Sequence, residues 1–66
     1  MMNKMTDESI KIIDPNILLS IINTKLRDQF SSLEQLCYDL DVTEDNLVNK
    51  LRAIGKEYDR ASNQFK

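Results

Sequence analysis

The chain lacks the side chains on which most enzyme sites depend. Its 66 residues include no histidine, no tryptophan and only one glycine. Without histidine there is no imidazole to act as a general acid or base or to bind zinc, and one glycine cannot build a glycine-rich phosphate loop. The sequence therefore predicts a protein that is not an enzyme and that holds no cofactor and no metal.

Cysteine and long apolar runs are equally scarce. The single cysteine cannot form a disulfide within the chain, and the longest apolar cluster, ILLSII at residues 17–22, is far too short to cross a bilayer. The opening residues, MMNKMTDES, lack the apolar run of a signal peptide. We expect a cytoplasmic protein that does not enter a membrane.

Acidic residues are concentrated in one part of the chain. The whole sequence has a net charge of −2, whereas residues 32–55 carry two basic and five acidic side chains, a local charge of −3. A DNA-binding surface needs the opposite sign to neutralise phosphates. A domain of this length also buries only a small core, so we expect marginal stability.

The acidic stretch is the most regular part of the sequence. Apolar residues recur at helical spacing on both sides of a break at Asp41. The apolar positions are Leu33, Leu36, Cys37, Leu40, Val42, Leu47, Leu51 and Ile54. This pattern predicts two short helices joined by a tight turn, which is typical of a helix-turn-helix.

A longer helix is predicted before this pair. Asp14-Pro15 is a helix-start signal, and the helix should run to about Gln29 or Phe30. Its predicted core face consists of Leu18, Leu19, Ile22, Leu26 and Phe30. Before this helix, residues 1–9 are predicted to form a polar tail, and residues 10–13 an apolar clip laid over the helix, with a short strand as the alternative.

Polar residues and the glycine mark the other predicted helix ends. Overlapping capping boxes start at Ser31 and at Ser32, and only one of them can operate. Thr43 is the predicted N-cap of the last helix, and Gly55 its predicted C-terminal stop.

The residues after the glycine predict a small hairpin. A loop over residues 60–63 would place Tyr58 opposite Phe65 and close the core. The predicted fold class is therefore mainly α: a three-helix bundle with a helix-turn-helix core, winged-helix-like, and a short C-terminal β-hairpin, with residues 1–13 as tail and clip and residues 14–66 as one domain. A three-helix domain related to ubiquitin-binding folds would place the same apolar residues differently and would lack the hairpin.

Several separated segments resemble one small bacterial family. DPNILLSIINTKLRD, SSLEQLCYDLDV, and IGKEYD together with NQF are similar to the domain of unknown function 4250, and the resemblance covers about Asp14 to Phe65. The chain departs from the family at Lys56, where a tyrosine is expected in a Gly-Tyr-x-Tyr-Asp run. The resemblance supports the domain boundaries and implies no activity, ligand or partner.

Three apolar side chains are candidate contacts with another protein or with a second copy of the chain. Ile17 and Ile21 lie opposite the core face of the first predicted helix, and Tyr38 points outward from the second. The alternative is that the clip at residues 10–13 covers the isoleucines while Tyr38 lies along its own helix. Cys37, which sits mid-helix among leucines, is predicted to be a small buried hydrophobe rather than a reactive thiol.

Polar residues of the last helix support a second hypothesis. A DNA-reading helix would present Asn46, Asn49, Lys50 and Arg52. Against this, Glu44 and Asp45 occupy the helix N-terminus, the part that usually enters the major groove. With Asp39 and Asp41 they lack the ligand spacing of a calcium loop, so we interpret all four as caps and turn residues. The sequence thus favours a small helical binding module with a protein partner or as a homodimer, and the alternative is a small helix-turn-helix DNA-binding transcriptional regulator.

Overall fold

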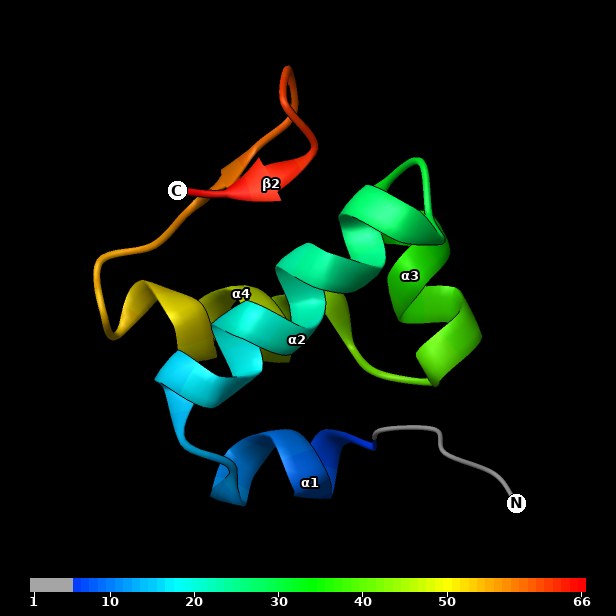
Figure 1. The fold of residues 1–66 in the computed structure, drawn as a ribbon. Helices are drawn as coiled ribbons and strands as arrows, with labels where there is room; N and C mark the ends of the chain where they lie inside the picture. The colour runs from blue at the N-terminus through cyan, green and yellow to red at the C-terminus, as the bar shows by residue number, and fades with distance from the viewer. Residues whose placement is uncertain (1–5) are drawn as a thin grey trace.

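The computed structural model describes residues 6–66, which form four helices followed by a two-stranded antiparallel hairpin (Figure 1). In chain order the elements are α1 (Asp7–Ile12), α2 (Pro15–Asp28), α3 (Leu33–Leu40), α4 (Glu44–Arg52), β1 (Tyr58–Asp59) and β2 (Gln64–Phe65). The mainly α class and the C-terminal hairpin are confirmed. The first five residues of the predicted tail lie outside the described residues.

The helix α1 lies where a tail and a clip were predicted. Thr6 Oγ1 accepts a hydrogen bond from the N–H of Ser9 at 3.3 Å, and Asp7 and Glu8 place negative charge in the first turn. The predictions of a tail up to residue 9 and of a short strand were therefore wrong. The predicted location of the clip was wrong as well, because α1 packs chiefly against α4, with Ile10 buried, rather than over α2.

The helix α2 begins and ends close to its predicted bounds. The Asp14 carboxylate accepts a hydrogen bond from the N–H of Asn16 at 2.8 Å, and Pro15 takes the first helical position. The helix ends at Asp28, with Gln29 as its C-cap. The predicted core face is confirmed, since Leu18, Ile22 and Leu26 are buried and Leu19 and Phe30 are half-buried against them.

Ser32 supplies the cap that starts α3. Its hydroxyl accepts a hydrogen bond from the N–H of Gln35 at 3.2 Å, while Gln35 Oε1 accepts one from the N–H of Ser31 at 3.1 Å. In a standard capping box the returning side chain meets the N–H of the cap residue itself. Here the Gln35 side chain accepts from the residue before the cap, so both Ser31 and Ser32 contribute hydrogen bonds that order the turn between α2 and α3.

Two helices end in the same left-handed turn. After α3, Asp41 has a φ of 63°, and the N–H of Val42 donates to the carbonyl of Cys37 at 3.0 Å. After α4, Gly55 has a φ of 79°, and the N–H of Lys56 makes the equivalent bond at 3.0 Å. Such bonds mark a Schellman turn, which favours glycine because a Cβ is strained at positive φ. The predicted stop at Gly55 is confirmed, whereas Asp41 adopts this conformation with a side chain.

The hairpin pairs the residues that the sequence predicted. Tyr58 lies opposite Phe65, and their rings are 5.5 Å apart between centroids. The side-chain amide of Asn23 joins β2 to α2. Its Nδ2 donates to the carbonyl of Phe65 at 3.1 Å, and the N–H of Phe65 donates to its Oδ1 at 2.8 Å, so the amide pairs with the backbone of Phe65 as a neighbouring strand would. Two hydrogen bonds thus fix the buried end of the hairpin on the middle of α2.

A second amide fixes the loop end of the hairpin. Asn63 Nδ2 donates to the carbonyls of Leu26 and Phe30 at 3.1 and 3.0 Å, and Oδ1 accepts from the hydroxyl of Tyr58 at 2.6 Å. Asn63 therefore satisfies carbonyls near the C-terminal end of α2 that would otherwise lack an intrahelical partner.

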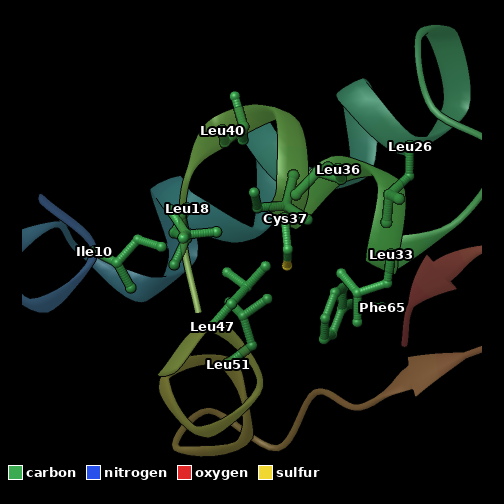
Figure 2. Close-up of a cluster of buried hydrophobic side chains, with 12 residues drawn as sticks. Ile10, Leu18, Leu26, Leu33, Leu36, Cys37, Leu40, Leu47, Leu51 and Phe65 are labelled. Carbon is green, nitrogen blue, oxygen red and sulfur yellow. The ribbon is translucent and has the colours of Figure 1, made fainter. Parts of the chain in front are cut away.

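The core is built by all four helices together with β2 (Figure 2). Its members are Ile10, Leu18, Ile22, Leu26, Leu33, Leu36, Cys37, Leu40, Val42, Leu47, Leu51 and Phe65. Ile54, an apolar position of the predicted last helix, lies beyond the end of α4 and is half-buried at the core's edge. Each fully buried leucine contributes roughly 1.5–3 kcal/mol relative to an exposed one.

Candidate protein interface

Two isoleucines are exposed on either side of the connection between α1 and α2. Ile12, at the end of α1, is 87% exposed, and Ile17, in the first turn of α2, is 55% exposed. Only Ile13 and Asp14 separate the two helices (Figure 1). Burial of such side chains in a complex is favourable, which makes this corner a candidate contact surface.

The sequence found part of this surface. Ile17 is exposed as predicted, but Ile21 is half-buried. Ile12 was missed because residues 10–13 were interpreted as extended. In a helix, Ile10 and Ile12 lie about 200° apart, so one is buried while the other faces solvent. The signal that could have revealed the helix is Thr6 followed by two acidic residues, a typical N-cap with a favourable first turn.

Tyr38 lies on a separate surface. It is 89% exposed on α3, and α3 is well removed from the α1–α2 connection (Figure 1). The three predicted protein contacts are therefore not brought together: Ile17 and Ile21 lie on α2, and Tyr38 would meet a different part of any partner.

The helix α1 covers part of the face of α4 that was the candidate DNA contact. Lys50 Nζ donates a hydrogen bond to the carbonyl oxygen of Lys11 at 2.8 Å. Asn46 and Lys50 are half-buried on this side of the helix, whereas Asn49 and Arg52 are exposed. The four predicted residues thus divide into a pair beside α1 and a pair that faces solvent.

The N-terminus of α4 is capped by a residue of α1. Thr43 occupies the predicted cap position, but its hydroxyl makes no cap bond and instead donates to Asp7 Oδ2 at 2.8 Å. The N–H of Thr43 donates to Asp7 Oδ1, also at 2.8 Å. In a capping box, a side chain three residues into the same helix would accept from this N–H. Here Asp7 does so from 36 residues away.

These hydrogen bonds stabilise the ionised carboxylate. The N–H of Thr43, and next its hydroxyl, hold the pKa of Asp7 below its ordinary value of 3.8. Asp7 therefore adds a third carboxylate to Glu44 and Asp45 at the start of α4. A phosphate that approached this end of the helix would meet more negative charge than the sequence of the helix alone indicates.

The family of the chain follows from its sequence match. The family model described as "Domain of unknown function (DUF4250)" matches residues 13–65. The chain belongs to this family. The resemblance drawn from the sequence is thereby confirmed, and no curated protein and no solved structure matches the chain. The match spans α2 to the hairpin, and α1 precedes it. At Lys56, where tyrosine was expected, this DUF4250 domain still forms its hairpin.

Cys37 of the DUF4250 domain is a core residue. It is 6% exposed, and its sulfur points into the core (Figure 2). Burial, and secondarily the carboxylates of Glu44, Glu34 and Asp7, raise the pKa of this thiol to about 11. The thiol is therefore protonated at neutral pH and is a poor nucleophile, as the interpretation of Cys37 as a buried hydrophobe requires.

An open cavity of about 490 Å³ lies at the C-terminal end of α2 and is formed by residues 26–31 together with Asn63. Three of its polar side chains already have partners within the chain: Arg27 and Asp28 pair at 2.8 Å, and the Asn63 amide donates to the carbonyls of Leu26 and Phe30. Within residues 6–66, no three His, Cys, Asp or Glu side chains gather as a metal site would require. None of the helices in this range combines the length and the apolar character that a membrane crossing demands.

Proposed function

We propose that this DUF4250 domain is a non-enzymatic, cytoplasmic binding module that self-associates through Ile12, Ile17 and Ile21, here called the isoleucine surface. The observation that carries the proposal is the exposure of Ile12 and Ile17, at 87% and 55%, in a chain whose other isoleucines are buried or half-buried. A second copy presents the same apolar side chains, so a two-fold contact would cover both surfaces at once. Tyr38 is then a separate candidate contact for a different protein.

Sedimentation of the full chain over a wide concentration range tests this proposal. The expected result is a dimer that dissociates on dilution. The double variant Ile12→Glu with Ile17→Glu should be monomeric, because buried charge is costly at an interface and harmless in water. Its melting temperature at low concentration should match that of the wild type, since both side chains are exposed.

The matched control carries two added carboxylates elsewhere. Ala53→Glu with Ala61→Glu changes two exposed residues outside the isoleucine surface and adds the same charge. This variant should dimerise as the wild type does. A wild-type chain that stays monomeric at the highest concentration reached would refute self-association.

A DNA-binding regulator is the alternative function, and the exposure of Asn49 and Arg52 on α4 favours it. The position of α1 beside Asn46 and Lys50, and the carboxylates at the start of α4, weigh against it. Because phosphate neutralisation supplies most non-specific affinity for DNA, we place this function second.

A further inference from the structure

The helix α1 docks on the domain much as a separate ligand would. Ile10 is the one residue of this helix that is fully buried. The polar contacts of α1 are made with residues far along the chain. Asp7 accepts two hydrogen bonds from Thr43, and the carbonyl of Lys11 accepts one from Lys50. A six-residue helix is not stable alone in water, so α1 depends on this docking surface. Nothing in these contacts requires that the two sides belong to one chain.

The connection to α2 allows α1 to leave without forming a different helix. Ile13 and Asp14 both have extended backbone angles, with φ and ψ of −78° and 147° and of −60° and 127°. Because Asp14 precedes Pro15, the helical conformation is disfavoured there, which opposes the merging of α1 and α2 into one long helix. A released α1 therefore remains a separate short segment.

The shortness of the connection between α1 and α2 determines which surfaces would meet if α1 docked on a second copy of the chain. The three steps of the chain from Ile12 to Pro15 span at most about 11 Å. If α1 docks on α4 of a second copy, the N-terminal ends of both α2 helices must approach each other. Ile12 and Ile17 flank this connection, so the isoleucines of the two copies would meet there.

We propose that the self-associated form is an exchanged dimer, in which α1 of each copy docks on α4 of the other through the contacts that it makes within one chain. This inference rests on the proposed self-association. Docking within one chain is favoured by an effective concentration on the order of millimolar. Exchange therefore needs an additional contact, and burial of the isoleucine surface between the copies supplies it.

Lysine cross-linking of the full, unsubstituted chain tests the exchange. Unlabelled protein and protein labelled with a heavy isotope are mixed and equilibrated at dimer-forming concentration, and a short amine-to-amine reagent then joins Lys11 to Lys50, whose ammonium lies on the Lys11 carbonyl. Mass spectrometry of the dimer fraction distinguishes cross-linked peptides of mixed label from those of one label. We expect Lys11–Lys50 peptides of mixed label in the dimer, and peptides of one label in the monomer.

Two results would overturn the exchange in distinguishable ways. A dimer in which every Lys11–Lys50 peptide carries a single label would show that α1 stays on its own chain, and self-association would stand without exchange. The absence of a dimer at any concentration would refute both. Ile12→Glu with Ile17→Glu should lose the mixed-label peptide and keep the single-label one, while Ala53→Glu with Ala61→Glu should keep both. Mixed-label peptides that persist in the isoleucine variant would contradict the role of the isoleucine surface.

Discussion

Glycine substitutions at two positions of positive φ should change stability in opposite directions. Asp41 has a φ of 63° and Asn63 a φ of 57°. At both sites glycine relieves the same backbone strain. The difference lies in the side chains, because Asp41 is exposed at the end of α3, whereas the amide of Asn63 bridges the hairpin to α2.

The expected gain for Asp41→Gly follows from two opposing effects. A left-handed backbone costs an L-residue roughly 1–2 kcal/mol, and Asp is among the residues that tolerate it best. Glycine also has more conformational freedom in the unfolded chain, which lowers the free energy of unfolding by about 0.4–1 kcal/mol. The net stabilisation is about 0.5–1 kcal/mol, which corresponds to a rise in melting temperature of about 2–8 °C for a domain of this size.

The same relief at Asn63 is outweighed by lost hydrogen bonds. The Asn63 amide makes three such bonds, with Leu26, Phe30 and Tyr58, at 3.1, 3.0 and 2.6 Å. At about 1 kcal/mol each, their loss exceeds the gain from the backbone. Asn63→Gly should therefore destabilise the domain by about 2 kcal/mol and lower the melting temperature by about 8 °C or more.

Thermal denaturation followed by far-ultraviolet circular dichroism measures both effects, and urea midpoints provide an independent scale. A lower melting temperature for Asp41→Gly would mean that the carboxylate makes a contribution to the turn that its exposure does not indicate. A higher melting temperature for Asn63→Gly would mean that the amide bonds contribute little. Either result refutes the reasoning, because it rests on the opposite signs.

Three further expectations concern the core, the contact between α1 and α4, and DNA. Leu51→Ala should lower the free energy of unfolding by about 2–5 kcal/mol, since Leu51 is fully buried. This is a large share of the roughly 3–10 kcal/mol expected for the unfolding of the whole domain. A fall in melting temperature of only a degree or two would contradict this expectation. Because hydrogen bonds from Thr43 lower the pKa of Asp7, the stability that Asp7 confers is complete above its unfolded pKa near 3.8 and is lost as the pH falls through the lower folded pKa. The difference in urea midpoint between wild type and Asp7→Asn should therefore vanish in acid, and a difference that persists there would exclude ionisation as its source. Fluorescence anisotropy with random duplex at physiological salt should show a dissociation constant weaker than roughly 10⁻⁴–10⁻⁶ M, whereas micromolar binding that weakens steeply with salt and is lost in Arg52→Ala would support the regulator.

Local signals in the sequence predicted most of the elements. Asp14-Pro15 and Gly55 predicted a helix start and a helix stop within a residue or two, because the physical causes of both lie in the residues themselves. Periodic leucines predicted which faces of α2, α3 and α4 are buried. The helix α1 escaped because six residues give less than two turns of periodicity, which is too few to distinguish a helix from an extended clip.

The contacts between distant residues could not be predicted from the pattern. Asp7 and Thr43 are 36 residues apart, and Asn23 and Phe65 are 42 apart. In the sequence, Asp7 is one acid among eleven, and Asn23 is a polar residue on an amphipathic helix. Their roles depend on which elements meet in space. The same holds for the candidate interface, where Ile17 was visible from helical spacing but Ile12 became a surface residue only once α1 was known to be a helix.

The position of Phe65 in the core constrains how the chain can fold as it is synthesised. Phe65 is 3% exposed and belongs to the same buried cluster as the leucines of α2, α3 and α4. All of these helices leave the ribosome before Phe65 does, so a nascent domain that already contains them still lacks the Phe65 side chain that completes its core. Partly folded chains with exposed apolar surface are prone to aggregation. A chain that terminates before Phe65 should therefore be recognised by chaperones and proteases as unfinished, even though every helix is present.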